Sequence, residues 1–396
     1  MKSIDQVNFK EKRALVRVDY NVPLNDKLEV TSKTRIERTY DTVKKITRDG
    51  GIAILMSHLG RPKGQVADSM SLKHIAGTVE NVMGQKVAFL GDVMDNDIEA
   101  KVAALNPGDI GMLENLRFHP EEEKGDKTFA EKLSKLGDIY VNDAFGTAHR
   151  AHASTTIVAQ FFPGNTYAGY LLYNEDASLK KALSHPQRPF TAIIGGAKVS
   201  TKIGIIENLL DKVDNLLISG GMSYTFLKAF GEEIGDSLVE ENIVDTVMEI
   251  VKKAYLKGVN IYLPMDSVCG DRFAEDAKVM TTENNTIPKG WMGLDIGPKT
   301  VKKFAMVLQQ SDTILWNGPA GVFEMKPFSR GTQAMGICVG AATLAGAYSL
   351  VGGGDTITAV GQFGLKNIVS YISTGGGAML EYLEGKVLPG IEALES

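Results

Sequence analysis

Short runs of β-branched and aliphatic residues alternate with helical patterns along the whole chain. In the first half these runs are Ala14–Val18, Ile52–Met56, Val87–Leu90, Ile110–Leu113 and Ile139–Val141. In the second half they are Thr191–Ile194, Asn215–Ile218, Val259–Leu263, Thr313–Trp316, Tyr348–Val351 and Ile368–Ile372. The helical patterns that separate them include Arg35–Thr47, Ser71–Met83, Lys202–Leu210, Ile243–Leu256 and Thr332–Leu344. Buried strands that alternate with helices predict an α/β fold with parallel sheets covered on both faces.

The length of 396 residues exceeds what one ordinary hydrophobic core holds, so we expect two domains. The turn-forming stretch Phe162–Asn165 indicates a boundary. A helical pattern, Tyr170–Ser184, follows it and stops at Pro186 and Pro189, because proline disfavours helix in the residue before it. We therefore predict two doubly wound parallel-sheet domains, residues 1–168 and 169–383, which this helix joins and a cleft separates.

The composition argues against several classes of protein. The net charge of -5 lacks the basic surplus of a protein that wraps nucleic acid. Two cysteines cannot form a disulfide framework, and they favour a reducing compartment. The N-terminal residues show no signal peptide, and no stretch approaches the ~18 uncharged apolar residues of a membrane helix. We expect a cytoplasmic protein with no nucleic-acid or membrane partner.

Polar and basic residues follow the strands of the first half at the points where these strands end. They are Asp19, Asn21, Arg35, His58, Arg61, Arg117, His149 and Arg150. Ligands of open α/β sheets bind beyond the carboxyl ends of the strands, and arginine suits carboxylate and phosphate oxygens. The pattern predicts a small, multiply anionic ligand, with Asp19 and Asn21 suited to its hydroxyl groups. The alternative is that each arginine makes an ordinary surface ion pair and that Asp19 only caps a turn.

Glycine takes the corresponding positions in the second half. The glycine-rich turns are Gly195–Lys198, Gly220–Met222, Asn317–Gly321, Gly352–Thr356 and Gly375–Gly377. Glycine allows the backbone to approach a ligand closely, and the helix that follows each turn offers free N–H groups to phosphate. Several such turns on one sheet edge predict a nucleotide site. The alternative is a set of tight strand-to-helix turns that bind nothing.

A few charged residues stand among these turns. Lys198 and Lys202 lie four apart at the start of a helical pattern, where they could neutralise nucleotide phosphates or simply face solvent. Asp355 could hold a Mg²⁺ ion carried by the nucleotide, or could only cap a helix. Glu324 could accept a hydrogen bond from a ribose hydroxyl.

Other motifs are absent or weak. The chain has no G-x-x-x-x-G-K-[ST] loop, no G-x-G-x-x-G that opens a helix after a strand, and no protein-kinase motif set. His149 and His152 are spaced as a metal pair could be, but no further ligand is near in sequence, which disfavours zinc. An NAD-dependent dehydrogenase and a non-catalytic binding protein are the competing interpretations.

The motifs resemble those of the phosphoglycerate kinase family. The matching segments of the first half are Val16–Pro23, His58–Pro62, Glu114–Phe118 and Ala148–Ser154. Those of the second half are Gly195–Ser200, Trp291–Asp295, Trp316–Pro319 and Gly352–Thr356. The matches run in family order over nearly the whole chain. The departures are Thr201, where many members have aspartate, and Met222–Tyr224, and neither falls on a residue expected to touch phosphate.

The resemblance implies two Rossmann-like domains with separate ligands. The first domain, with residues 384–396 returning to it, would bind 3-phosphoglycerate or 1,3-bisphosphoglycerate through Asp19, Asn21, Arg35, His58, Leu59, Gly60, Arg61, Arg117 and Arg150. The second would bind ADP or ATP through Gly196, Ala197, Lys198, Lys202, Gly220, Gly221, Gly293, Leu294, Asn317, Pro319, Glu324, Gly353, Gly354, Asp355 and Thr356.

The resemblance also implies a mechanism, which is Mg²⁺-dependent phosphoryl transfer between 1,3-bisphosphoglycerate and ADP, as in glycolysis. Such transfer needs alignment and charge neutralisation more than covalent help. The expected catalytic residues are Arg35, Lys202, Gly354 and Gly377, with Asp355 as the metal ligand. We expect a monomer whose domains close on a hinge, because closure aligns the ligands and excludes water.

Overall fold

The computed structural model describes residues 1–395 and divides them into two compact units. Unit 1 contains Met1–Asp176 together with the chain's last residues from Val387, and unit 2 contains Ala177–Lys386. The long helix α7, Tyr170–Leu183, contains the division between them. No helix within residues 1–395 has both the length and the apolar character that crossing a bilayer requires.

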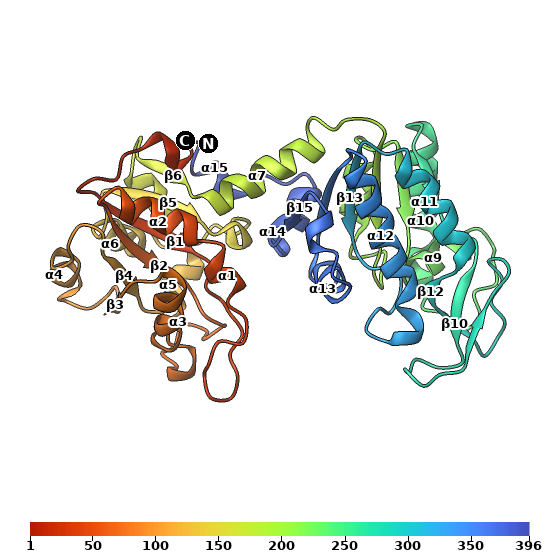
Figure 1. Cartoon of the computed structure of the whole chain (residues 1–396), viewed down its shortest axis with the longest axis horizontal. Helices are drawn as coiled ribbons and strands as arrows, with labels where there is room; N and C mark the ends of the chain where they lie inside the picture. The colour runs from red at the N-terminus through yellow and green to blue at the C-terminus, as the bar shows by residue number, and fades with distance from the viewer. Residues whose placement is uncertain (396) are drawn as a thin grey trace. The chain divides into compact units, whose positions relative to one another are not determined.

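A six-stranded parallel sheet forms the centre of unit 1 (Figure 1). Its strands are β1 Arg13–Val18, β2 Ile52–Met56, β3 Val87–Gly91, β4 Ile110–Leu113, β5 Ile139–Asp143 and β6 Thr166–Ala168. Their spatial order is β3-β4-β2-β1-β5-β6. The central strands β1 and β5 are buried on both faces, which explains why they read as continuous apolar runs in the sequence.

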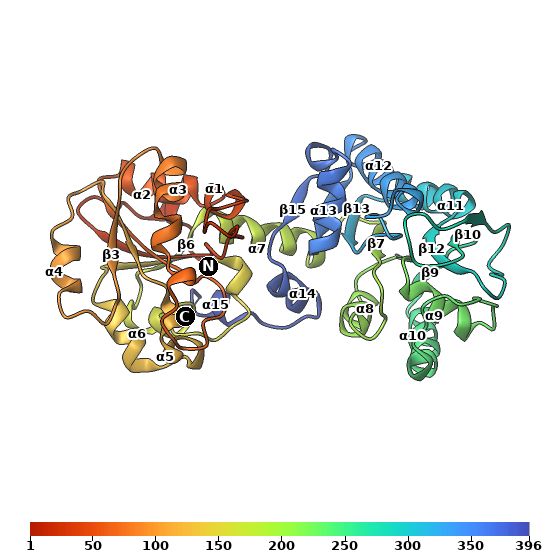
Figure 2. The same ribbon diagram turned by 90° about the horizontal axis from the view of Figure 1, so that it is seen from below.

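Helices cover both faces of this sheet (Figure 2). They are α1 Thr34–Glu37, α2 Tyr40–Arg48, α3 Lys73–Met83, α4 Ile98–Ala103, α5 Pro120–Lys124, α6 Lys127–Ser134 and α15 Pro389–Glu392. The expected helix 35–47 is therefore two helices. Between them, the Thr39 hydroxyl donates to the carbonyl of Ile36 and bonds the Tyr20 hydroxyl at 2.8 Å, and such side-chain bonds compete with a continuous helix.

Unit 2 is built around a second six-stranded parallel sheet, of order β15-β14-β13-β7-β8-β9. These strands are β7 Phe190–Ile194, β8 Asn215–Ile218, β9 Asn260–Tyr262, β13 Thr313–Asn317, β14 Tyr348–Gly352 and β15 Tyr371–Ser373. The expected strand 368–372 thus begins only at Tyr371, because Lys366–Ile368 forms a 3₁₀ turn. The parallel-sheet α/β architecture predicted for both halves of the chain is confirmed.

The helices of unit 2 again lie on both faces of the sheet, with α11 to α13 on one face and α8 to α10 on the other (Figure 2). Their bounds are α8 Ile203–Leu209, α9 Met222–Ala229, α10 Val244–Leu256, α11 Pro298–Gln309, α12 Arg330–Leu344, α13 Gly354–Gln362 and α14 Gly377–Leu383. A small antiparallel sheet, which the sequence analysis did not predict, consists of β10 Ser267–Gly270, β11 Val279–Thr281 and β12 Met292–Ile296.

The strand order fixes where each sheet can bind a ligand. In unit 1 the chain leaves β1 toward β2 on one side and leaves β5 toward β6 on the other, although β1 and β5 are neighbours. In unit 2 the neighbours β7 and β13 diverge in the same way. The loops at such a divergence leave a crevice beyond the carboxyl ends of the strands, which is where α/β sheets bind ligands.

Candidate active site

A cluster of basic side chains lies beyond the carboxyl ends of the strands in unit 1. His58, just after β2, is buried, and its pKa lies well below the ordinary value because of burial and the positive charges of Arg17, Arg117, Arg150 and Arg35. These four guanidinium groups all disfavour protonation of the imidazole, so His58 is neutral at physiological pH. The structure brings together His58, Arg35, Arg117 and Arg150, as predicted from the sequence.

Arg117 has a buried N–H donor without a partner among the residues that the structure describes. Its guanidinium is almost fully buried, Nη1 donates to the carbonyl of Gly60 at 3.0 Å, and Nε lies 3.4 Å from the Glu123 carboxylate. Nη2 is buried and has no hydrogen-bond partner within residues 1–395. The pKa of Arg117 is lowered to about 10, chiefly by burial and also by Arg150 and Arg17, against the opposing effect of Glu123. A buried N–H donor without a partner is costly, so an anionic ligand at this position would stabilise it.

The loop after β2 is held by two asparagines. The Asn21 side chain accepts from the Gly60 backbone N–H at 2.9 Å, and Asn115 donates to the carbonyl of Leu59 at 2.7 Å. Gly60 has a positive φ of 64°, which a β-carbon would strain. Leu59 itself is buried, so the loop offers its backbone rather than this side chain.

Asp19 and Arg35 form an ion pair at the edge of the cluster. Arg35 Nη1 donates to Asp19 Oδ2 at 2.6 Å, and about half of the Arg35 side chain (45%) is exposed. Asp19 also accepts from the backbone N–H of Asn21. Arg61 is exposed and makes no hydrogen bond or ion pair to the described part of the chain, so its place in the site rests on sequence alone.

Three buried charged or titratable residues in or beside the cluster were not predicted from the sequence as site residues. Arg17 lies inside β1 and is fully buried. His152 is buried too, and burial together with Arg117, Arg17 and Arg150 lowers its pKa to about 3. Glu122, on α5, is fully buried nearby and bonds Ser154. A charged residue inside an apolar strand, as in Ala14–Val18, is the signal that could have identified Arg17.

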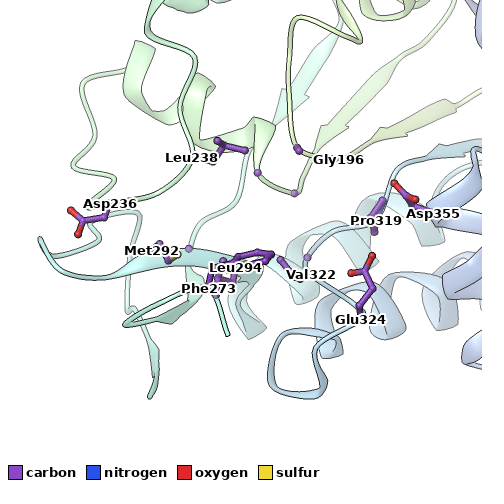
Figure 3. A pocket seen from close by; sticks show the side chains of 15 residues that line it. Gly196, Asp236, Leu238, Phe273, Met292, Leu294, Pro319, Val322, Glu324 and Asp355 are labelled. Carbon is purple, nitrogen blue, oxygen red and sulfur yellow. The ribbon is translucent and has the colours of Figure 1, made fainter. Parts of the chain in front are cut away.

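A pocket of about 470 Å³ lies beyond the sheet of unit 2 (Figure 3). Nine predicted nucleotide residues line it: Gly196, Ala197, Gly220, Gly221, Gly293, Leu294, Pro319, Glu324 and Asp355. Gly321, from the predicted turn Asn317–Gly321, lines it too, and the lining residues not predicted are Asp236, Leu238, Phe273, Met292 and Val322. In Figure 3 Leu238 faces Leu294 and Phe273 across the opening. This apolar half of the pocket suits a flat aromatic base, and the half with Asp355 and Glu324 is polar.

The remaining predicted residues lie beside or beneath this pocket. Asn317 is fully buried, accepts from the Lys202 ammonium and donates to the carbonyl of Gly352 at 2.9 Å. Burial lowers the pKa of Lys202, and the Asp355 carboxylate opposes this effect. Thr356 is buried and accepts from the backbone N–H of Gly318 at 2.7 Å.

The last four predicted residues are an exposed lysine and three glycines at the starts of helices. Lys198 is exposed, Gly353 has a positive φ of 96° and caps α13, Gly354 begins α13, and Gly377 begins α14. The structure thus places Gly353 and Gly354 at a helix N-terminus next to Asp355, where backbone N–H groups are free for an anion.

Comparison with known proteins identifies the family. A family model described as phosphoglycerate kinase matches residues 4–386. A phosphoglycerate kinase of Porphyromonas gingivalis is 50% identical over 417 aligned positions, which cover 99% of this chain and 100% of the relative. One from Acaryochloris marina is 50% identical over 99% of this chain and 98% of the relative.

Solved structures agree with the sequence comparisons. A phosphoglycerate kinase from Coxiella burnetii matches with a TM-score of 0.92 and 41% identity, over 99% of this chain and 98% of that one. One from Pyrococcus horikoshii matches with a TM-score of 0.83 and 29% identity, over 100% of this chain and 98% of that one. The family match, the full-length identity and the shared fold lead to one conclusion: the chain belongs to the phosphoglycerate kinase family and is a phosphotransferase.

Proposed function

We propose that the basic cluster of unit 1 binds 3-phosphoglycerate, that the pocket of unit 2 binds ATP, and that the terminal phosphoryl group passes reversibly between them. An oxygen of the 3-phosphoglycerate carboxylate forms a bond to the γ-phosphorus, and the bond from that phosphorus to the bridging oxygen of ADP breaks. The acceptor oxygen is already anionic, so no side chain has to remove a proton. The observation that carries the proposal is the buried, unpartnered Arg117 Nη2 among four cationic groups.

The basic cluster suits both ends of the acid. Arg117, Arg150 and His58 offer donors to phosphate or carboxylate oxygens, and the neutral imidazole adds a hydrogen bond without adding to the repulsion between cations. Asp19 and Asn21 have oxygen atoms on the same edge, and these suit the hydroxyl group of the glycerate. Arg61 would add a further cation from the loop after β2.

The pocket of unit 2 suits a nucleotide. Its apolar residues would hold the base, Glu324 would accept from a ribose hydroxyl, and the glycine turns would bring backbone N–H groups to the phosphates. Lys202 and the exposed Lys198 supply positive charge on the phosphate side. Because Asn317 already accepts from Lys202, the ammonium is held in place before a nucleotide binds.

The Mg²⁺ ion that such a nucleotide carries would be held by Asp355. The Asp355 carboxylate lines the pocket and makes no hydrogen bond or ion pair within residues 1–395. No group of three or more His, Cys, Asp or Glu side chains in this range is arranged to hold a metal alone. One carboxylate plus phosphate oxygens fits the preference of Mg²⁺. When bound, the ion would neutralise charge on the phosphates.

Arg35 is the residue we assign to the moving phosphoryl group. It stands at the rim of the cluster, half exposed and held by Asp19, so it can contact charge that develops at the acceptor oxygen. Lys202 would do the same from the nucleotide side. The N–H groups at the start of α13, with Gly354 first, and at Gly377 would add neutral donors.

The first experiment is an assay with 3-phosphoglycerate, ATP and Mg²⁺, in which a coupled dehydrogenase reports formation of the acyl phosphate. Arg35→Ala should lower kcat by roughly 10²–10³-fold, because a donor aimed at transition-state charge is lost. Arg48→Ala removes an exposed arginine of the same unit, on α2, and should leave kcat unchanged. Chelation of Mg²⁺ should abolish turnover.

Two outcomes would contradict the proposal. Near-normal kcat in a folded Arg35→Ala protein would remove the role given to Arg35. A folded wild-type protein that binds ADP but shows no turnover would make the chain a binding protein, and the buried arginines would then need another anion.

We further propose that the protein works as a monomer in the cytoplasm. Both cysteines are free thiols, with Cys269 buried and Cys338 partly buried, which fits a reducing compartment. Light scattering coupled to size-exclusion chromatography tests the monomer, and a mass near twice 42.8 kDa would exclude it.

A further inference from the structure

Arg17 is a fully buried cation whose direct partners are all neutral. Its Nε donates to the Ser154 hydroxyl at 2.7 Å, Nη1 donates to the carbonyl of Val18, and Nη2 lies 3.2 Å from Nδ1 of His58. No carboxylate within residues 1–395 forms an ion pair with it. A buried guanidinium is stable only when hydrogen bonds and opposite charge compensate for lost hydration, so its counter-charge must act from further away.

Glu122 supplies that charge through Ser154. The Glu122 side chain is fully buried, and its two oxygens accept from the Ser154 backbone N–H at 2.9 Å and from the Ser154 hydroxyl at 2.6 Å. A hydroxyl has one proton. The Ser154 hydroxyl therefore donates to Glu122 and uses an oxygen lone pair to accept from Arg17.

The same reasoning fixes the proton on His58. Arginine has only donors, so the 3.2 Å contact from Arg17 Nη2 requires Nδ1 of His58 to be the acceptor. A neutral imidazole with a bare Nδ1 carries its proton on Nε2. Nε2 makes no hydrogen bond to the described residues, so this N–H is free for a ligand.

We infer that Glu122 and Ser154 are positioning residues: through Arg17 they hold His58 as the Nε2–H tautomer, which presents a neutral donor to an anionic oxygen of the acid substrate. The inference rests on the proposed function, since it takes His58 to contact 3-phosphoglycerate. It adds to that function a chain of hydrogen bonds with assigned donors: Ser154 donates to Glu122, Arg17 donates to Ser154 and to His58, and His58 donates to the ligand.

A purely structural role is the competing explanation. The Glu122 backbone carbonyl accepts from the N–H of Ala153 at 2.9 Å, and Tyr140 donates to the carbonyl of Ser154 at 2.9 Å, so this region also builds the fold. A structural role would change the unfolding temperature of variants. It would change neither the tautomer of His58 nor the KM for one substrate alone.

The first test is nitrogen NMR of the wild-type protein, with the His58 resonances assigned by His58→Gln. We expect the Nε2–H tautomer at neutral pH, and the Nδ1–H tautomer would overturn the inference. In Ser154→Ala the preference should weaken, and in Ser154→Thr, which keeps a hydroxyl, it should persist. The wild-type measurement is decisive even if a variant fails to fold.

The second test is steady-state kinetics. Ser154→Ala should raise the KM for 3-phosphoglycerate about ten-fold, because a hydrogen bond to a charged group is lost, with the KM for ATP within about two-fold of wild type. Glu122→Gln should act in the same direction. Glu121→Gln removes a charge from the same helix outside this network and serves as the control. Equal rises of both KM values, or no change in a folded Ser154→Ala protein, would overturn the inference.

These tests separate the inference from the proposed function. If the wild-type protein shows no turnover of 3-phosphoglycerate, the proposed function fails, while the tautomer of His58 is still measured. If turnover occurs and His58 is the Nδ1–H tautomer, the function stands and the positioning role is wrong.

Discussion

His58 and His152 are two imidazoles buried among guanidinium groups, and this environment keeps them neutral. Burial is the largest cause of the low pKa of each, and Arg17, Arg117 and Arg150 act on both. In the free protein, positive charges therefore surround two imidazoles that stay neutral. An anionic ligand would offset this positive charge, so its binding would stabilise the folded protein.

The low pKa of His152 predicts how stability depends on pH. In the unfolded chain His152 binds a proton below its ordinary pKa of 6.5, whereas in the folded protein it does so only below about 3. The unfolded state thus binds more protons between these values. The contribution of His152 to the stability of the folded protein is therefore present above pH 6.5 and is lost progressively as the pH falls toward 3.

We expect His152→Gln to flatten this dependence, because glutamine does not titrate. The measurement is urea denaturation followed by circular dichroism from about pH 7 to about pH 4, where the slope of unfolding free energy against pH reports bound protons. His185→Gln, at an exposed histidine, is the control. An unchanged slope in a folded His152→Gln protein would contradict the assigned environment.

At the residue scale, the sequence was informative where a side chain of the basic cluster lies in the loop after a strand. His58, Arg117 and Arg150 were predicted because strand ends can be located from apolar runs. Arg17 was not identified as a member of the cluster because it lies within such a run. Glu122 and Ser154 could not be paired from the sequence, since their contact joins elements that only tertiary folding brings together.

At the element scale, the glycine turns of unit 2 have a packing role beside any ligand role. A β-carbon on Gly195 would lie 2.2 Å from the carbonyl oxygen of Pro319, and one on Gly318 would lie 2.2 Å from that of Gly195. One on Gly220 would lie 2.7 Å from the N of Gly196. The loops after β7, β8 and β13 therefore pack backbone against backbone, which only glycine permits.

Gly195→Ala should consequently lower both the stability of unit 2 and its affinity for ADP, since backbone atoms have to move apart. Titration calorimetry with ADP and thermal unfolding followed by tryptophan fluorescence are the measurements. Gly77→Ala is the comparison, because a β-carbon at this position in α3 meets nothing within 4 Å. It should leave the ADP affinity and the fluorescence transition of unit 2 unchanged, and should stabilise unit 1, followed by circular dichroism, by about 0.5–1 kcal/mol. Unaltered ADP affinity and unfolding temperature in Gly195→Ala would refute the packing role.

Apolar runs located the buried strands of the two parallel sheets and missed the antiparallel strands. Strands β10 and β11 are as short as β4 and β8, but they lack the continuous buried apolar run that identified those two strands. They nevertheless belong to the antiparallel sheet whose strand β12 contributes Met292 and Leu294 to the pocket. Apart from Leu294, which the family resemblance implied, the apolar half of the pocket was not predicted, while the glycine half was visible as sequence motifs.

At the scale of the whole molecule, unit 1 is discontinuous in sequence. The chain's last residues pack within it, with Leu388, Ile391 and Leu394 buried. The Gly390 N–H donates to the carbonyl of Ala148 at 2.8 Å, directly before His149 and Arg150 of the basic cluster. The C-terminal segment therefore supports a loop of the proposed substrate site from a distance of more than two hundred positions in sequence.

The two tryptophans, Trp291 and Trp316, both lie in unit 2 and make unit-specific measurement possible. Leu388→Ala should destabilise unit 1 by about 2–5 kcal/mol, because a buried side chain leaves a cavity. Circular dichroism should then show an earlier transition, while the fluorescence midpoint stays where it is in the wild type. Leu344→Ala, at an exposed position of α12, is the control. Coincident shifts of both signals would show that the units do not unfold separately.

The discontinuity of unit 1 sets the order in which a ribosome can deliver a complete fold. Unit 2 consists of the continuous residues 177–386, so this unit has its full sequence before Val387 is added. The first segment of unit 1 precedes unit 2 in sequence, yet unit 1 lacks helix α15 until unit 2 has been synthesised. Domains usually complete folding from the N-terminus onward during synthesis. Here the first segment of unit 1 waits for a segment made after unit 2, and the loop near Ala148, which belongs to the proposed substrate site, gains this support only then.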